Sequence, residues 1–339
     1  MFLSPWSIGS PVAILKDTAI DVDGQGLPNV PAQLIARARL DVEKSQAASP
    51  SVGTAPLSVA IRDPMFRHYF HFIETLLILF AAQREYFPGA RLEKFYFGAL
   101  EWNNPSHADV QRHLLTILYP GAEIITNLGS EPIAVENLIY IDRRLARTSM
   151  NKMIDPVLFL VAKWGPALRA RIYAALGIEL RGAPSSGVMR RSLYVPRKPP
   201  RTMAPDVEQS VMNMLAAATD VSTAEFTGMP WADQVRASAE SDLMLGVHGN
   251  GLTNLLWMPP HARVIELFPE GVHHYDYQVL SEVMHLDYFG LEGARIFRPF
   301  SRHGAPYGHN AEANKPVERI QSDALKLALS VDALTRRTS

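Results

Sequence analysis

The sequence predicts an α/β protein built from two successive series of alternating strands and helices. Three observations predict this class. Short apolar runs rich in β-branched and aromatic residues alternate with longer segments of helical periodicity. The length of 339 residues is enough for two domains. A segment of Gly, Ala, Pro and Ser at residues 181–187 lies between the two series and predicts a hinge.

The first series favours a parallel sheet, because its strands are separated by segments long enough for crossover helices. We expect strands at residues 12–15, 57–61, 95–97, 123–125 and 138–141. We expect helices at residues 68–87, 106–118 and 156–176. Glycine or proline follows each helix closely, as is typical of helix ends.

The second series has the same organisation. We expect strands at residues 192–195, 223–226, 242–247 and 263–268. We expect helices at residues 205–218, 231–239, 251–258, 275–284 and 316–334. The domain prediction is therefore an N-terminal domain over 1–180 and a C-terminal domain over 181–315. It leaves open that the last helix, within 316–339, joins the N-terminal domain.

Composition excludes several classes of protein. The 33 basic and 34 acidic side chains give a net charge of -1, which argues against nucleic-acid binding by bulk charge. Hydrophobic residues make up 47% of the chain, so a largely disordered protein is excluded. The chain has no cysteine, so disulfides, thiolate nucleophiles and zinc–thiolate sites are excluded.

The sequence also bears on location. No apolar run reaches the roughly 20 residues that a membrane helix needs, and the N-terminal residues lack the basic start of a signal peptide. We therefore expect a cytoplasmic protein without a transmembrane segment. A peripheral attachment at the inner face of the membrane is left open.

The densest chemical signal follows the predicted strand at 242–247. This strand runs directly into a His-Gly-Asn-Gly sequence and then into a short predicted helix. Glycines let backbone N–H groups approach a ligand, and a helix N-terminus attracts anions, so a phosphate or diphosphate site is one interpretation. A tight turn shaped by the two glycines is the other. The candidate phosphate ligands are His248, Gly249, Asn250, Gly251, Thr253 and Asn254.

Two neighbouring strand ends supply further candidates. Arg197 and Arg201 follow the strand at 192–195, and a guanidinium binds phosphate through two parallel hydrogen bonds. Glu266 lies in the strand at 263–268, where a carboxylate can bind the hydroxyls of a ribose. The alternatives are a solvated basic loop for the arginines and a buried carboxylate paired with an arginine for Glu266.

Candidate catalytic residues lie near the start of the long helix of the first series. His71 and Glu74 are three residues apart and therefore share one helix face, and Asp63 lies in the turn before the helix. A histidine oriented by a carboxylate, or the carboxylate itself, can remove a proton from a hydroxyl. The alternative is that His71 packs under the sheet while Glu74 pairs with an arginine.

Two patterns imitate metal sites. Asp21-Val22-Asp23 offers two carboxylates that can hold Mg²⁺ or Mn²⁺, but the glycines around Gln25 favour an ordinary turn. His68, His71 and Glu74 do not have the His-Glu-x-x-His spacing. We therefore expect no metal site and no cofactor. For the His273-His274 pair we expect a solvated loop, with contact to a sugar or base as the alternative.

The stretch from Arg197 to Phe268 resembles the signature of glycosyltransferase family 61. In that family an arginine-rich strand end is followed by Asn or Asp at a helix start, a Gln, the sequence His-Gly-Ala-Gly-Leu-Thr-Asn and a strand with Val-Ile-Glu. The corresponding residues here are Arg197, Arg201, Asp206, Gln234, the run from His248 to Asn254, and Val264-Ile265-Glu266. Asn250 replaces the usual Ala of that family.

An N-terminal motif supports the same resemblance, which covers residues 57–300. The run from His71 to Glu74 is similar to the His-Trp-x-x-Glu stretch of bacterial members with a role in capsular polysaccharide synthesis, although Phe72 replaces the Trp. The resemblance implies a GT-B architecture, in which two Rossmann-like domains face each other across a cleft. It also implies an inverting, metal-independent hexosyl-, pentosyl- or N-acetylhexosaminyltransferase.

The resemblance further implies the division of labour between the domains. A nucleotide sugar, often a UDP-sugar, would bind the C-terminal domain through the phosphate ligands and Glu266. A glycan or glycolipid acceptor would bind the N-terminal domain, with His71, Glu74 or Asp63 as the base. Two alternatives stay open: a nucleotide-sugar epimerase of the GT-B type, and a non-catalytic module that binds glycan or nucleotide.

Overall fold

The computed structural model divides the chain into two compact units, residues 1–172 and 173–339. It describes residues 12–23, 27–30, 33, 56–63, 68–97, 105–145, 157–181, 189–272, 274–297 and 315–330. Among these residues each unit has one six-stranded sheet together with helices, which confirms the predicted α/β class. Apart from Arg181, the predicted hinge lies outside the described residues.

The sheet of the first unit has the strand order β2-β1-β6-β3-β4-β5. Its strands are β1 (Val12–Val22), β2 (Pro28–Asn29), β3 (Leu57–Arg62), β4 (Leu92–Tyr96), β5 (Glu123–Ile125) and β6 (Ile133–Asp142). Strands β3 to β6 are parallel, whereas β1 runs antiparallel to β6. The helical elements are α2 (Tyr69–Tyr86), α3 (Pro105–Leu118), the 3₁₀ turn η2 (Arg143–Leu145) and α4 (Leu158–Leu176).

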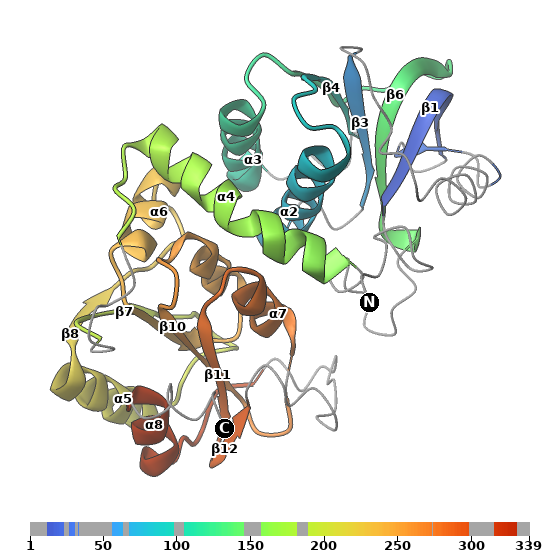
Figure 1. Ribbon diagram of the computed structural model, residues 1–339. Helices are drawn as coiled ribbons and strands as arrows, with labels where there is room; N and C mark the ends of the chain where they lie inside the picture. The colour runs from blue at the N-terminus through green and yellow to red at the C-terminus, as the bar shows by residue number, and fades with distance from the viewer. Residues whose placement is uncertain are drawn as a thin grey trace. The chain divides into compact units, whose positions relative to one another are not determined.

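Helices α2 and α3 are the crossovers from β3 to β4 and from β4 to β5, and both cover one face of the sheet (Figure 1). Helix α2 is apolar around most of its circumference, which is typical of a buried helix. It therefore carries Glu74 into the interior, where 1% of the residue is exposed. Strands β3 and β6 are parallel neighbours, so the residues that follow them meet at one edge of the sheet.

The sheet of the second unit has the strand order β12-β11-β10-β9-β7-β8. Its strands are β7 (Arg191–Val195), β8 (Asp220–Thr223), β9 (Leu243–Val247), β10 (Arg263–Phe268), β11 (Asp287–Glu292) and β12 (Arg295–Phe297). All are parallel to their neighbours except the edge strand β12. The helical elements are α5 (Pro205–Ala218), α6 (Trp231–Ala239), the 3₁₀ helix η4 (Asn250–Trp257), α7 (Asp276–Val283) and α8 (Ser322–Leu329).

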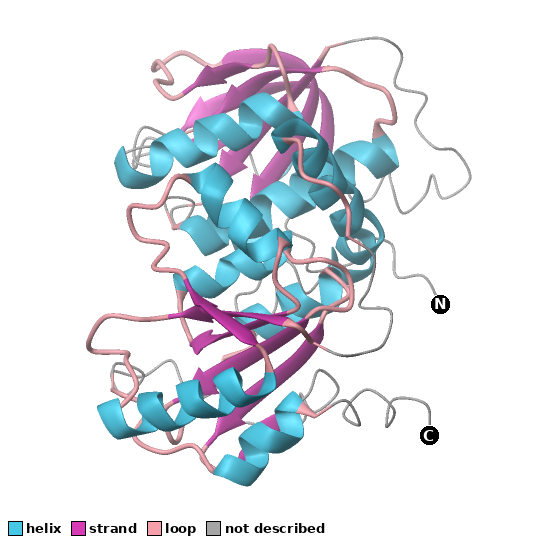
Figure 2. Cartoon of the chain, turned by 90° about the vertical axis from the view of Figure 1, so that its left-hand side faces the viewer, coloured by secondary structure: helices cyan, strands magenta, loops and turns pink. Residues whose placement is uncertain are grey.

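Helices cover both faces of this second sheet. Figures 1 and 2 show α5 and α8 on one face, and α6 and α7 on the other. Helix α8 contacts α5 and β11, and its buried residues Ala324, Leu325 and Ala328 are part of the core beneath the sheet. Helix α8 therefore packs on the sheet of the second unit.

Several predicted elements differ in extent from the observed ones. Strand β1 continues to Val22 because it pairs with β6 over most of its length, a long-range contact that an apolar run does not reveal. Strand β8 lies three residues earlier than predicted, since its register against β7 begins with Asp220 opposite Arg191. The predicted helix at 251–258 is a 3₁₀ helix. Among the described helices, none is both long and apolar enough to cross a membrane.

Close approach between β9 and β7 explains one of the glycines. A β-carbon at Gly246 would lie 2.9 Å from the carbonyl oxygen of Val195, which belongs to backbone that cannot easily move. We predict that Gly246→Ala lowers the free energy of unfolding by about 1–3 kcal/mol, as overpacking does. Denaturant unfolding measures this. Gly129→Ala, where no atom lies within 4 Å, is the control, and equal effects of the two substitutions would contradict the prediction.

Candidate active site

Several of the predicted site residues gather into two clusters, one in each unit. Both lie where parallel strands of their own sheet end, which is the usual place for ligands in open α/β sheets. The first, called the Arg143 cluster, consists of Asp63, His71, Glu74 and Arg143. The second, called the His248 cluster, consists of His248, Glu266, His274 and Tyr288.

Arg143 connects all three candidate catalytic residues of the first unit. Its Nε and Nη2 donate to the two carboxylate oxygens of Asp63 at 2.9 and 3.2 Å. The same Nη2 donates to Oε2 of Glu74 at 3.2 Å and lies 3.0 Å from Nδ1 of His71. That Nδ1 also lies 2.8 Å from Oε2 of Glu74. The structure therefore brings the three residues together, around a cation.

The opposite charges of the Arg143 cluster stabilise one another in the interior of the unit. The carboxylates of Asp63 and Glu74 are almost fully buried, which is costly without a paired cation. Burial alone would lower the pKa of Arg143, but Asp63 and Glu74 raise it above its usual value. Arg143 therefore stays charged and pairs with both carboxylates beside His71.

His71 is the most exposed member of this cluster, since 26% of its side chain is exposed against 16% for Arg143. A proton on its Nδ1 makes that nitrogen a donor to Glu74, and Nε2 then carries the lone pair. This is the arrangement of a general base whose orientation is set by a buried carboxylate. Glu74 also pairs with Arg143, as the structural alternative from the sequence had it. This ion pair and the hydrogen bond between His71 and Glu74 are present together.

Arg143 is a functional candidate that sequence reasoning missed. It follows β6 directly, and the sequence Asp142-Arg143-Arg144 after an apolar strand was the available signal. The neighbouring parallel strand β3 ends beside it, with Arg62 opposite Asp142 in register. Only the pairing of β3 with β6, which joins residues some 80 positions apart, brings Arg143 to Asp63.

In the second unit, Glu266 holds His248 through a short hydrogen bond. Nδ1 of His248 lies 2.5 Å from Oε1 of Glu266, and the Tyr288 hydroxyl donates to Oε2 of the same carboxylate at 2.5 Å. Glu266 is 0% exposed. The structure therefore places its carboxylate behind His248, with one oxygen bonded to the imidazole and the other to the phenol.

The register of the sheet explains how this carboxylate fits. Glu266 in β10 lies opposite Gly246 in β9 and opposite Gly290 in β11. Neither neighbour has a side chain, so there is room for the carboxylate between the strands. His248 and Tyr288 lie two residues from these glycines along their chains, which is the distance at which side chains return to the same face. Burial, followed by the charge of Glu266, raises the pKa of Tyr288 well above its usual value, so Tyr288 remains a donor.

The two predicted arginines lie beside the His248 loop. A β-carbon at Gly249 would lie 1.2 Å from Nη1 of Arg197, so the guanidinium occupies the space that only a glycine leaves open. Burial lowers the pKa of Arg197, and the charge of Arg201 acts in the same direction. Arg201 is thus near enough for its charge to act on Arg197, and two such cations favour binding of an anion.

Tyr277, which sequence reasoning missed, lies next to the same arginines. Its ring is 5.3 Å from that of His248, between centroids. Burial raises the pKa of its phenol strongly, against the opposing influence of Thr253, Arg197 and Arg201. A neutral phenol beside two cations adds a hydrogen-bond donor to this part of the sheet edge. In the predicted helix, Tyr277 stands among apolar residues as a core tyrosine does. Nothing in the sequence therefore marked it as a site residue.

The other predicted phosphate ligands differ in accessibility. Asn250 is exposed and Gly251 is partly exposed at the start of η4, whereas Thr253 and Asn254 are buried. Nδ2 of Asn254 donates to Oε1 of Gln234 at 3.0 Å and to the carbonyl of Gly251 at 3.2 Å. Asn254 therefore shapes the loop from within, and Gln234 ties it to α6.

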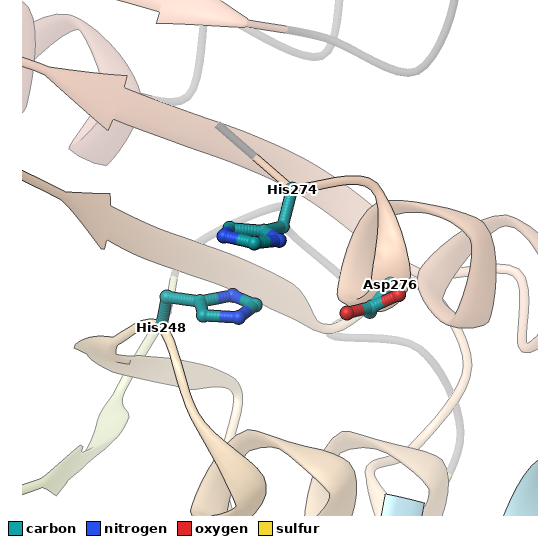
Figure 3. A group of neighbouring side chains, drawn as sticks. All are labelled: His248, His274 and Asp276. Atoms are coloured by element: carbon teal, nitrogen blue, oxygen red, sulfur yellow. The ribbon is translucent and has the colours of Figure 1, made fainter. Parts of the chain in front are cut away.

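Asp276 lies beside the His248 cluster, next to the stacked rings of His248 and His274. Figure 3 shows the imidazoles of His248 and His274 one above the other, with a carboxylate oxygen of Asp276 directed toward them. The ring centroids are 4.3 Å apart and the planes differ by 13°. His274 is 3% exposed, so the solvated loop predicted there is wrong for this residue, and His273 lies outside the described residues.

These three residues are also the candidate metal ligands among the described residues. Their ligand atoms lie within 4.8 Å of one another. The lone pairs of an imidazole lie in its ring plane, however, and in two nearly parallel rings they do not converge on one point. The two neighbouring guanidiniums also oppose a further cation. The arrangement fits a stacked imidazole pair better than a metal centre.

The acidic pair Asp21 and Asp23, and Lys198 after β7, take part in structural or surface interactions. Asp21 lies in β1, and the carboxylate of Asp23 pairs with Arg62 and accepts the backbone N–H of Leu27 at 3.0 Å, which closes the β1–β2 connection. Lys198 forms an exposed ion pair with Glu225 at 2.5 Å. Of the basic residues after β7, Lys198 therefore belongs to the surface.

A comparison with protein families identifies the chain. The model of the glycosyltransferase 61 family matches residues 66–265, which is more than half of the sequence and includes Arg143, Arg197 and His248. The chain belongs to glycosyltransferase family 61. A comparison with curated proteins finds no match. The resemblance expected from the sequence is thus confirmed, and glycosyl transfer is the activity that the family supports.

Some site residues of this family 61 member lie within the matched range, and others lie beyond it. It includes His71, Glu74 and both arginines that follow β7, and it ends at Ile265. Glu266 is the next residue, and His274, Asp276 and Tyr277 lie farther along the chain. The part of the His248 cluster on α7 and β11 is therefore described by the structure alone.

The buried charges of the Arg143 cluster make a testable prediction. Arg143→Met leaves two buried carboxylates without their cation, so we expect the free energy of unfolding to fall by about 3–5 kcal/mol. Adding Glu74→Gln removes one of the two negative charges and should restore part of this loss. Denaturant unfolding of both variants is the measurement.

The control for Arg143 is Arg236→Met, which breaks an exposed ion pair with Asp233 and should cost about 1 kcal/mol or less. An Arg143→Met protein as stable as the control would show that the cluster is not held by its charges.

Proposed function

We propose that this family 61 glycosyltransferase is an inverting, metal-independent enzyme of polysaccharide biosynthesis. It transfers a sugar from a nucleotide sugar, specifically a UDP-sugar, to a hydroxyl of a glycan or glycolipid. The observation that carries the proposal is the group of cations at the carboxyl edge of the second sheet. Arg197 lies there against the loop that begins with His248, and Arg201 is near enough for its charge to act on Arg197.

The donor diphosphate is the ligand that this group of cations suits. Guanidiniums bind phosphate oxygens in pairs, and the N–H groups of the glycine-rich loop add neutral donors. When the bond between the anomeric carbon and the phosphate oxygen breaks, negative charge develops on the departing diphosphate. Cations placed beforehand stabilise that charge. We assign Glu266 to orienting His248, instead of the ribose contact that the sequence predicted.

The acceptor is activated by the Arg143 cluster in this proposal. Nε2 of His71 takes the proton of the acceptor hydroxyl, and the hydroxyl oxygen forms a bond to the anomeric carbon. The bond from that carbon to the phosphate oxygen breaks, and its electron pair leaves with the nucleoside diphosphate. Glu74 stabilises the imidazolium that results, and Arg143 with Asp63 keeps Glu74 in place. The Glu74 carboxylate and Asp63 are the reserve bases.

The same proposal includes the architecture and the setting. Two units with one six-stranded sheet each are consistent with a GT-B enzyme whose C-terminal domain binds the donor and whose N-terminal domain binds the acceptor. We propose that it works in the cytoplasm, at the inner face of the membrane where the acceptor is a glycolipid. No cofactor beyond the nucleotide sugar is required.

The first test concerns the donor. We predict that Arg197→Ala weakens UDP binding by roughly 10- to 100-fold, because a charge-assisted hydrogen bond contributes about 1.5–3 kcal/mol. Titration calorimetry with UDP measures this. Lys198→Ala is the matched control, because Lys198 is the neighbouring cation but pairs with Glu225. The affinity of this variant for UDP should be unchanged. A wild-type protein that binds no UDP would overturn the proposed donor.

The second test separates acceptor activation from donor binding. We predict that His71→Ala lowers kcat for transfer by roughly 10²- to 10⁴-fold, the usual contribution of a general base, while UDP affinity stays unchanged. His113→Gln, an exposed histidine on α3, is the control. Unchanged transfer by the His71 variant would remove it from the reaction.

The assay of wild-type enzyme with a panel of nucleotide sugars also tests the remaining parts of the proposal. Activity that is equal with and without EDTA is expected, and activity that EDTA abolishes would overturn the metal-free mechanism. Nuclear magnetic resonance of the products distinguishes transfer to an acceptor from an epimerised sugar. A protein that binds UDP but shows no turnover with any acceptor would be a binding module.

A further inference from the structure

The stacked imidazoles of His248 and His274 are an unusual feature for the interior of a sheet edge. Both residues are buried, at 8% and 3% exposure, and their ring centroids are 4.3 Å apart. Two imidazolium ions at this distance repel each other strongly where water is excluded, whereas one imidazolium and one neutral ring can stack. The pair is therefore a place where the first proton binds more easily than the second.

Charged and titratable groups reach this pair from every neighbouring element. Two carboxylates favour protonation, Glu266 from β10 and Asp276 from α7. Two guanidiniums oppose it, and they belong to the loop that follows β7. The phenols of Tyr277 on α7 and Tyr288 on β11 remain neutral. Among the described residues, these groups are Arg197, Arg201, Glu266, Asp276, Tyr277 and Tyr288.

Positive charges balance the carboxylates before any ligand binds. The two guanidiniums already equal the charge of Glu266 and Asp276, so each proton added to the imidazoles makes the cluster more positive. A bound diphosphate brings two or more negative charges to the same place. It removes the electrostatic cost of a proton on the imidazoles and adds phosphate oxygens as acceptors. Because Nδ1 of His248 is bonded to Glu266, Nε2 is the nitrogen that faces away from the carboxylate.

We propose that the His248–His274 pair takes up a proton from solvent when the donor diphosphate binds, so that His248 holds a phosphate oxygen through Nε2–H. This inference rests on the proposed function, and it makes His274 a positioning residue for donor binding. During transfer the same Nε2–H stays bonded to the oxygen that leaves with the diphosphate. No further reactant is required, since the proton comes from water and returns to it when the product dissociates.

Linkage makes the proposal measurable without turnover. If binding takes up protons, the affinity for UDP falls as pH rises, and the heat of binding depends on the ionisation enthalpy of the buffer. The terminal phosphate of UDP titrates near pH 6 and would release a proton in a cationic site. Its contribution therefore has the opposite sign and cannot imitate uptake by the protein.

The experiment is titration calorimetry of the full chain with UDP at pH 7.5 in three buffers of different ionisation enthalpy. We expect the wild type to take up a proton in a substantial fraction of binding events, approaching about one per UDP bound. His274→Asn should lose most of this uptake and bind UDP more weakly. Inorganic pyrophosphate, as a second probe, should show the same uptake if the diphosphate alone is responsible.

The matched control is His261→Asn. His261 is an exposed histidine of the same unit with a positive φ of 63°, a conformation that asparagine tolerates. The proton uptake of the His261→Asn protein on binding UDP should equal that of the wild type. If His274→Asn does not fold, the slope of UDP affinity against pH in the wild type gives the same proton number. UDP binding without uptake would overturn this inference alone, whereas absence of UDP binding would overturn the proposed donor as well.

Discussion

The buried carboxylate of Glu266 is the group on which the site of the second unit depends. It is fully buried in the middle of a parallel sheet, where an ionised carboxylate is stable only if both of its oxygens are bonded. His248 and Tyr288 meet that requirement from the two adjacent strands, and the glycines opposite Glu266 leave the space. The orientation of the imidazole, and with it the nitrogen offered to a ligand, follows from this single buried group.

The first unit also contains buried carboxylates, but these are paired with an arginine. Asp63 and Glu74 are as deeply buried as Glu266, but there a guanidinium compensates two carboxylates at once. A guanidinium suits this role because its planar fork can donate to several oxygens and stays charged when buried. In both units a buried carboxylate fixes a histidine that reaches closer to solvent. The orientation of each histidine therefore follows from polar groups at the edge of its own sheet.

Local pattern was enough to predict the fold class, most strands and helices, and several residues of both clusters, among them His71, His248 and Glu266. It did not reveal Arg143, which joins Asp63 only because β3 and β6 are neighbours, nor Tyr288, which reaches Glu266 across β10 and β11. Such contacts depend on strand order, and strand order is set by long-range packing. His274 was misplaced for a related reason, since an His-His-Tyr sequence after a strand reads as polar loop until its stacking on His248 is known.

The two clusters differ in the balance of their charges, and this difference supports the assignment of their roles. Around Arg143 two buried carboxylates lie beside one guanidinium, and His71 is bonded to one of those carboxylates. Around His248 two guanidiniums and two imidazoles face two carboxylates, so every added proton needs a new negative charge. A cluster of the first kind suits removal of a proton from a neutral hydroxyl. A cluster of the second kind is completed by an anion, and a diphosphate supplies the charge that it lacks.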